Sequence, residues 1–297
     1  MSQDAPPTID PVAAERWHRA APPQSPWLHE EVARRMEDRL QWIRLTPASW
    51  AHWEPLRGGL GAQALLARRY PGAECLLVET VSRRALAVRQ QLAQPWWRAW
   101  RASSMRHLDA LPAQSVQMLW ANMALHLSAE PQALLAHWHR ALATGGFLMF
   151  SCLGPDSLRE LRALYRSQGW PPPGPDFTDM HDWGDMLVHA GFAEPVMDME
   201  RITLTYADAA GLIGDLRQVG ANLHPDRYPA LRGRGFRPLL EQRIEAGLRG
   251  PDGRLGLTFE IIYGHAMKPS PRVPVAGESS VSLQDMRALL RGGRDAR

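Results

Sequence analysis

Residues 54–61, EPLRGGLG, combine an acid with three glycines between a short apolar patch and an amphipathic segment. Glycine lets the backbone approach a ligand closely, so a glycine-rich turn between a strand and a helix can cradle a nucleotide-like ligand. Proline removes one backbone donor, and arginine fills space that glycine would leave open. The stretch therefore has three interpretations: a ligand-binding loop, a degenerate remnant of one, or an ordinary surface turn.

Two further polar residues stand where apolar runs end. Glu79 closes the run AECLLVE, and Asn122 stands near the end of VQMLWANM. An acid and an amide at such positions can form hydrogen bonds with a ligand. Each also has a simpler interpretation, because an acid is commonly exposed after a strand and asparagine commonly ends a strand in a turn.

The elements that would position these residues alternate along the chain. Apolar runs that indicate buried strands stand at 73–79, 116–123 and 147–153, residues 195–206 show strand-like alternation, and 257–267 is expected to be the last strand. Helical periodicity covers 27–45, 62–70, 82–94, 131–143, 156–168 and 180–192. This alternation predicts an α/β fold with a mostly parallel, doubly wound sheet flanked by helices. In such a fold, ligands bind outside the carboxyl ends of the strands, where the glycine-rich stretch, Glu79 and Asn122 stand.

The chain is expected to form one main domain, 27–269, after an N-terminal segment, 1–26. The stretch between the last two strand-like runs is too long for a plain connection, which predicts a helical insertion at about 208–250. The tail, 270–297, is rich in Pro, Ser, Gly and charged residues and is expected to be mobile.

Composition excludes several classes of function. No apolar run is long enough to span a membrane, and the N-terminus lacks the apolar core of a secretory signal, so a cytoplasmic location is expected. The net charge is +3, but the basic residues are scattered among acids, which disfavours a nucleic-acid partner. Cys75 and Cys152 lie in apolar runs and are expected to be buried thiols, and no Cys or His spacing indicates a metal site.

Four segments carry a more specific signal: GPDSLRELRAL at 154–164, the run from FTDMHD to ITLTY at 177–206, DLRQVGANL at 215–223, and FEIIYGHAMKP at 259–269. Together they resemble the BioC family of class I S-adenosylmethionine (SAM) dependent methyltransferases, over about residues 10–269. BioC enzymes methylate malonyl-acyl-carrier protein at the entry to the pimeloyl branch of biotin synthesis. The resemblance implies a Rossmann-like fold, SAM as cofactor, and the free carboxylate of malonyl-acyl-carrier protein as the group methylated.

The family loop is close to L-D-x-G-x-G-T-G, and the stretch EPLRGGLG departs from it. Counting back from LLARRYP places the last two family glycines at Gly59 and Gly61, but Arg57 at the first glycine and Pro55 at the acid. A shift of one residue recovers Glu54 as the acid. The first SAM motif is therefore degenerate, with Glu54, Gly59 and Gly61 as the implied cofactor residues.

Other implied cofactor positions match the family better. Glu79 corresponds to the acid that accepts hydrogen bonds from the ribose hydroxyls, and Asn122 to the residue beside the sulfonium. Asp109 is an imperfect match to the acid that borders the adenine. Gln117 replaces a family acid in the fourth strand, which is a second departure.

The implied chemistry needs no general base, because a malonyl carboxylate is already ionised at neutral pH. A cationic or hydrogen-bonding group should orient it, and the candidates are His181, Tyr206, Arg217 and His265. Simpler interpretations are a first-turn residue for His181, a packed core aromatic for Tyr206, and a solvated arginine for Arg217.

The predicted insertion carries Arg232, Arg234, Arg237 and Arg243. These arginines could meet an acidic carrier protein, or they could form a solvated helix face. Two alternative functions are a BioC-like paralogue that has lost catalysis and acts as a binding or regulatory protein, and a methyltransferase with another acid substrate.

Overall fold

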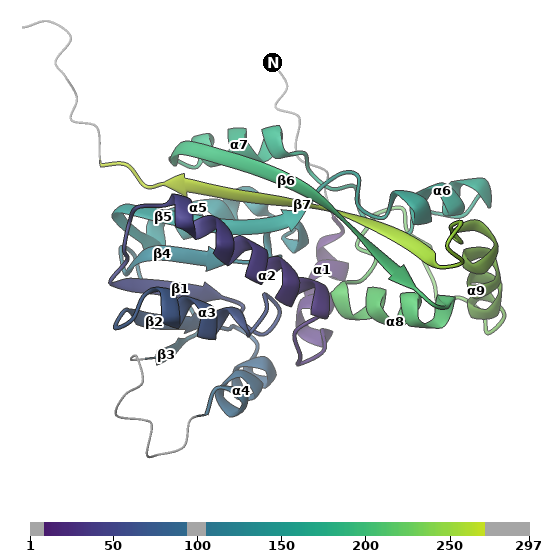
Figure 1. Cartoon of the computed structure of the whole chain (residues 1–297), viewed down its shortest axis with the longest axis horizontal. Helices are drawn as coiled ribbons and strands as arrows, with labels where there is room; N and C mark the ends of the chain where they lie inside the picture. The colour runs from purple at the N-terminus through teal and green to yellow at the C-terminus, as the bar shows by residue number, and fades with distance from the viewer. Residues whose placement is uncertain (1–8, 94–104, 271–297) are drawn as a thin grey trace, which may run out of the picture.

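The structure is a computed structural model that describes residues 9–93 and 105–270. It contains a sheet of seven strands in the order β3-β2-β1-β4-β5-β7-β6 (Figure 1). β1 to β5 are parallel, and β7 runs antiparallel between β5 and β6. The predicted α/β fold with a mostly parallel sheet is confirmed. The strands are β1 (Ser49–Trp53), β2 (Glu74–Val78), β3 (Met105–Leu108), β4 (Val116–Ala121), β5 (Leu142–Leu153), β6 (Ala193–Tyr206) and β7 (Leu255–Met267).

Helices cover both faces of the sheet, because strands buried on both sides need apolar cover on each. One face packs mainly against α2, α3, α6, α8 and α9, and the other against α5 and α7. The helices are α1 (Pro11–Ala20), α2 (Trp27–Arg39), α3 (Ala62–Arg69), α4 (Ser82–Gln91), α5 (Pro131–Ala141), α6 (Arg159–Ser167), α7 (Met180–His189), α8 (Ala209–Val219) and α9 (Phe236–Gly247), with short 3-10 turns η1 (Leu40–Trp42) and η3 (Leu125–Leu127).

Most expected elements are present, with shifted ends. The helix expected at 27–45 ends at Arg39, and a 3-10 turn carries the chain to Trp42. The strand expected at 116–123 ends at Ala121, because Met123 adopts a positive φ of 54° that breaks the extended backbone. The N-terminal segment contains the helix α1, which no feature of the sequence had indicated.

The region between β6 and β7 holds α8 and α9, separated by residues 220–235 without helix or strand. α8 packs against α9, and α9 also contacts α6. Together these three helices form one end of the molecule, beyond the carboxyl end of β5 (Figure 1). Of the predicted tail, only Ser270 belongs to the described residues.

Cys75 and Cys152 are free and buried, which confirms the prediction for both thiols. Burial raises the pKa of Cys75 to about 12, so its thiol stays protonated at neutral pH. Among the described residues, no helix has the length and apolar character that crossing a bilayer demands.

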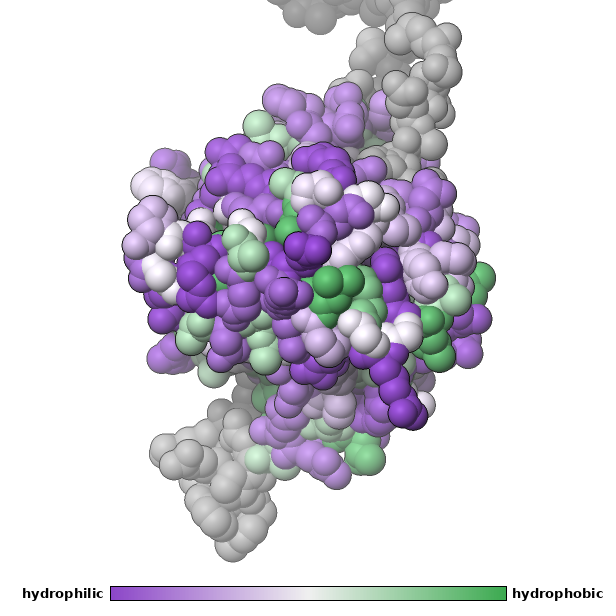
Figure 2. Space-filling view, turned by 90° about the vertical axis from the view of Figure 1, so that its right-hand side faces the viewer, coloured by the Kyte–Doolittle hydropathy of each residue, from purple (hydrophilic) through white to green (hydrophobic). Residues whose placement is uncertain are grey.

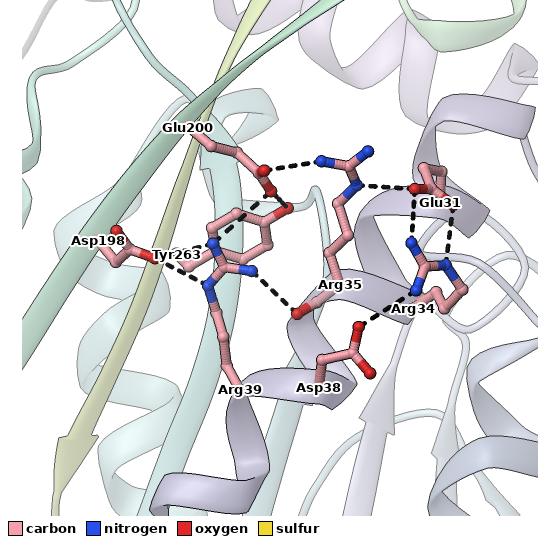
Figure 3. Close-up of polar contacts among 8 residues, drawn as sticks. All are labelled: Glu31, Arg34, Arg35, Asp38, Arg39, Asp198, Glu200 and Tyr263. Carbon is pink, nitrogen blue, oxygen red and sulfur yellow. Dashed lines mark hydrogen bonds and ion pairs between the residues drawn. The ribbon is translucent and has the colours of Figure 1, made fainter.

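A polar network fastens α2 to the antiparallel part of the sheet (Figure 3). Arg35 pairs with Glu200 at 2.7 Å, and Arg39 pairs with Asp198 at 2.8 Å. The hydroxyl of Tyr263, a side chain only 1% exposed, donates to Glu200 at 2.6 Å. The guanidinium of Arg39 lies 3.7 Å from the centre of the Tyr263 ring. The buried phenol thus links the edge of the sheet to the helix above it.

Replacing Tyr263 with Phe should lower the free energy of unfolding by about 1.5–3 kcal/mol, because it removes a hydrogen bond to a carboxylate. Urea unfolding followed by circular dichroism measures the change. Tyr228→Phe, at a site 42% exposed, is the matched control and should change stability by less than about 0.5 kcal/mol. Equal stability of wild type and Tyr263→Phe would show that the network contributes nothing to the fold.

Candidate functional site

A cavity of about 280 Å³ opens at the carboxyl ends of β1 and β4. This is the edge at which a parallel sheet is expected to bind ligands. The charged and aromatic side chains in its lining come from three elements besides the strand ends: Glu15, Trp17 and His18 from α1, Glu54 and Arg57 from the loop after β1, and Arg84 from α4. Gly58, Asn122 and Met123 complete the part of the lining nearest the sheet.

The loop after β1 turns sharply at Glu54, whose φ is 44°. Its amide donates to the carbonyl of Val78 at 2.8 Å, which places Glu54 level with Glu79 at the ends of neighbouring strands. Gly58 is the glycine that lines the cavity. A Cβ added there would lie 3.0 Å from the carbonyl oxygen of Asn122, so the loop tolerates no larger residue at this point without movement.

Gly59 and Gly61, the glycines expected from the sequence to meet the cofactor, face α2. Gly59 has a φ of 94°, and a Cβ there would lie 3.0 Å from the carbonyl of His29. The amide of Gly61 donates to the Glu30 carboxylate at 3.0 Å. Neither residue lines the cavity. The structure therefore favours the frame that puts Glu54 at the strand end.

Asn122 joins four parts of the fold. Its Nδ2 donates to the carbonyls of His29 at 2.8 Å and Gly58 at 2.5 Å, and its Oδ1 accepts from the hydroxyl of Ser151 at 2.5 Å. The side chain is 1% exposed. Both of its N–H groups are used within the protein, so Asn122 shapes the cavity mainly by holding the loop in place.

A buried ion pair lies behind the cavity wall. Arg84 and Glu79 are 1% and 2% exposed, and Nη2 of Arg84 lies 2.8 Å from Oε1 of Glu79. Arg84 also donates to the carbonyl of His18 in α1. The second carboxylate oxygen of Glu79, Oε2, is buried with no hydrogen-bond partner among the described residues. This oxygen is a buried acceptor that the described residues leave unsatisfied.

Glu54 lies on the same side of the cavity. Its carboxylate is 3.3 Å from Nδ1 of His18 and 3.7 Å from Nη2 of Arg84. Burial raises the pKa of both Glu54 and Glu79, and it outweighs the opposing effect of Arg84 on both acids and of Arg57 on Glu54. Two acids and one arginine thus give this wall an excess of negative charge when both carboxylates are ionised.

Arg57, which the sequence presented as an obstruction in the loop, reaches across to α8. Its Nη2 donates to the carbonyls of Gln218 at 2.9 Å and Val219 at 3.0 Å. Its guanidinium lies 5.2 Å from the centre of the Trp17 ring. The side chain is 5% exposed and lines the cavity. Arg57 therefore connects the loop, the N-terminal helix and the region between β6 and β7.

A second cavity, of about 320 Å³, lies between α6, α8, α9 and the loop before α7. Most of its lining is apolar, including Leu161, Leu216, Ile244 and Phe259. Leu127 lines both cavities, so the two adjoin. Figure 2 looks onto the end of the molecule that carries α6, α8 and α9 and shows apolar side chains exposed among hydrophilic ones. The pair of cavities offers a charged compartment beside an apolar one.

The four candidate orienting residues do not converge. Arg217 lines the second cavity, whereas Tyr206 is buried in a separate small pocket beside α2 and α8. His181 is exposed in the first turn of α7, where its amide donates to the N-cap Asp179. His265 of β7 pairs with Met149, which stands four residues before the carboxyl end of β5.

The remaining predicted residues lie outside both cavities. Asp109 is exposed just after β3. Gln117 lies near the amino end of β4, where its Oε1 accepts from the amide of Ala48 at 2.7 Å. Arg232 stacks on the rings of Tyr228 and Phe236, and the other insertion arginines are Arg234, Arg237 and Arg243.

Sequence reasoning missed four residues in or behind the first cavity: Trp17, His18, His29 and Arg84. Trp17 and His18 belong to a segment that gave no strong helical pattern. The only available signal for Arg84 was its place five residues after Glu79, at the start of a helix that follows a strand. Within the described residues, no cluster of three or more His, Cys, Asp or Glu side chains could hold a metal ion.

Comparisons with known proteins agree on the class of fold. A family model described as a methyltransferase domain matches residues 57–150. Malonyl-acyl-carrier-protein O-methyltransferase of Gallionella capsiferriformans is 39% identical over 254 residues, which cover 83% of this chain and 86% of that protein. The enzyme of the same name from Laribacter hongkongensis is 40% identical over 274 residues, covering 88% and 87%.

Solved structures share the fold at low identity. The YcgJ protein of Bacillus subtilis is 10% identical with a TM-score of 0.54, over 81% of this chain and 99% of that one. The cyclase SpnF is 14% identical with a TM-score of 0.50, over 90% of this chain and 100% of that one. Because the fold carries different activities, function must be argued from the site.

Replacing Arg84 with Ala should lower the free energy of unfolding at pH 8 by about 3–5 kcal/mol, because it leaves the Glu79 carboxylate buried without its partner. Arg89→Ala, exposed on the same helix, should change it by less than about 0.5 kcal/mol.

The difference in the free energy of unfolding between wild type and Arg84→Ala should be smaller in acid than at pH 8. Burial raises the pKa of Glu79 in the folded state above its ordinary 4.5, so its ionised form costs stability at neutral pH and this cost vanishes on protonation. The ion pair contributes only while Glu79 is ionised. Denaturant titrations at pH 8 and pH 4.5 measure the difference, and a difference that grows in acid would contradict the assignment.

Proposed function

This chain belongs to the malonyl-acyl-carrier-protein O-methyltransferase family, and we propose that it transfers a methyl group from SAM to the free carboxylate of malonyl-acyl-carrier protein. The observation that carries the proposal is the charged cavity at the carboxyl ends of β1 and β4 beside an apolar cavity. The first suits a zwitterionic nucleoside cofactor, and the second suits the arm of an acyl thioester.

The residues of the first cavity fit SAM, which supplies an electrophilic methyl group on a sulfonium when bound. The unpartnered Oε2 of Glu79 would accept hydrogen bonds from the ribose hydroxyls. Glu54 would attract the cationic groups of the cofactor. Gly58 would let the backbone approach it, and Asn122 would keep that glycine in position.

The protein has little proton chemistry to perform. A malonyl carboxylate has a pKa well below 7 and is nucleophilic without a general base. The residues of the site need to align one carboxylate oxygen with the methyl group and to exclude water. Trp17 and His18 of α1 form a wall of the cavity that would serve the second purpose.

Arg217 lines the second cavity, which supports it as the residue that would orient the acceptor carboxylate. The assignments of His181, Tyr206, His265 and Asp109 stay predictions from the family resemblance. A role in biotin synthesis, a cytoplasmic location and a carrier-protein contact through the insertion arginines are parts of the same proposal. Neither nucleic acid nor a membrane is proposed as a partner.

The direct test is incubation of the purified protein with methyl-labelled SAM and malonyl-acyl-carrier protein. We expect label in a base-labile methyl ester on the carrier. Acetyl-acyl-carrier protein, which lacks the free carboxylate, is the matched control and should stay unlabelled. No label in a fully malonylated carrier would reject the proposed reaction, and label only with a different acyl acid would reassign the substrate.

Glu79→Gln should weaken binding of S-adenosylhomocysteine by about tenfold, because a neutral amide accepts hydrogen bonds less strongly than a carboxylate. Isothermal titration calorimetry measures the dissociation constant. Glu74→Gln, at the opposite end of β2, is the control and should leave binding unchanged. Unaltered affinity in Glu79→Gln would remove Glu79 from the cofactor site.

A further inference from the structure

We propose that Arg57 is the centre of a carboxylate-binding subsite at the junction of the two cavities. The proposal rests on the proposed function, because both the cofactor and the acceptor of that reaction carry a carboxylate. It assigns a binding role to an arginine of the glycine-rich loop after β1.

Arg57 is a buried cation without a counterion. Its side chain is 5% exposed, and no carboxylate of the described residues lies within ion-pair distance of it. Nη2 is satisfied by two backbone carbonyls, whereas Nη1 is buried with no partner in the described part of the chain. Burial of a cation and burial of a donor without a hydrogen bond both cost free energy. An anionic ligand bound at Nη1 would reduce both costs.

The histidines beside Arg57 are uncharged, and Glu54 and Glu79 act on its charge only from beyond ion-pair distance. Burial and then the charge of Arg57 lower the pKa values of His29 and His126 to about 3, so both imidazoles are neutral at pH 7. Burial lowers the pKa of Arg57 itself to about 10, which keeps it protonated. Nε2 of His29 and Nδ1 of His126 are also buried without partners among the described residues. The subsite therefore holds one positive charge beside neutral polar atoms, and the nearby charges of Glu54, Glu79 and Arg84 act on it without forming an ion pair.

Arg57 lies where both ligands would meet. Its side chain lines the first cavity, and its Nη2 holds the end of α8, whose Val219 lines the second. His126 lines the second cavity as well. The acids Glu54 and Glu79 are held instead by His18 and Arg84. The negative wall and the positive subsite are thus distinct parts of one site.

The Nη1 amino group, with its two N–H donors, can hold one oxygen of a carboxylate and leave the other oxygen free. That geometry suits either of two sources: the methionyl carboxylate of the cofactor, or the acceptor carboxylate, whose free oxygen would then attack the methyl group. The recognition chemistry is the same, and binding measurements separate the two.

The test compares wild type with Arg57→Met, using three probes in calorimetry: S-adenosylhomocysteine, 5′-methylthioadenosine, and malonyl-acyl-carrier protein in the presence of S-adenosylhomocysteine. 5′-Methylthioadenosine lacks the amino-acid portion and its carboxylate. If the subsite holds the cofactor, S-adenosylhomocysteine should bind about tenfold or more weakly while 5′-methylthioadenosine binds unchanged. If it holds the acceptor, only the carrier affinity should fall by that factor.

Arg89→Met, exposed on α4, is the matched control and should alter none of the three affinities. Arg57→Lys keeps the positive charge and tests the subsite if Arg57→Met does not fold. It should weaken binding of the same probes as Arg57→Met, by a smaller factor. Unchanged affinities, or equal losses for S-adenosylhomocysteine and 5′-methylthioadenosine, would overturn the proposal. None of these readouts requires turnover, so failure of the labelling assay and failure of the subsite are separate results.

Discussion

The candidate site depends on the hydrogen bonds of the Asn122 side-chain amide. This amide holds the carbonyl of Gly58 in the loop after β1, the carbonyl of His29 in α2 and the hydroxyl of Ser151 in β5. Because the group is buried, each of these hydrogen bonds would be expensive to lose. One side chain thereby fixes the loop, the helix above it and two neighbouring strands relative to each other.

The buried charged side chains around Asn122 fall into two groups. Glu79 and Arg84 form a close pair behind the cavity, and Glu54 extends the negative wall towards α1. Arg57 turns away from these acids and is held by carbonyl oxygens at the end of α8. Carbonyl dipoles stabilise the Arg57 cation only in part. The site therefore has a negative part at Glu54 and Glu79 and a positive part at Arg57, an arrangement that suits a zwitterionic ligand.

The N-terminal helix α1 encloses the first cavity on one side. α1 starts with the N-cap Asp10, whose carboxylate also pairs with Arg227 at 2.6 Å. The carbonyl of His18 accepts from Arg84, and Trp17 lies beside Arg57. The edge of the sheet is therefore covered by a helix tied to it through charged groups, and the first cavity has a wall that the α/β sheet alone would lack.

The sequence predicted β2, β4 and β5 because a strand buried on both faces is mostly apolar, but it did not predict β3, none of whose four residues is fully buried. It also placed Glu79 and Asn122 at the ends of their strands, since that position follows from chain order alone. It misjudged the ends of several elements, such as the end of β4 at Ala121, because a positive φ at Met123 leaves no mark in hydrophobic periodicity.

The frame of the glycine-rich loop could not be decided from residue types. Counting back from α3 favoured Gly59 and Gly61, but the pairing of β1 with β2 puts Glu54 beside Glu79 and leaves Gly58 on the cavity. Strand pairing joins segments that are distant in the sequence, and so does the contact of α1 with Arg84, so residue types alone do not predict either one.

By itself, the sequence determined the fold class, the family and the edge of the sheet where chemistry would occur, because these follow from local pattern and order. Only the tertiary structure decided which glycine meets the cavity, which acid is paired, and that Arg57 is a buried cation whose Nη1 has no partner among the described residues, because charge and hydrogen-bond balance depend on neighbours far away in the chain.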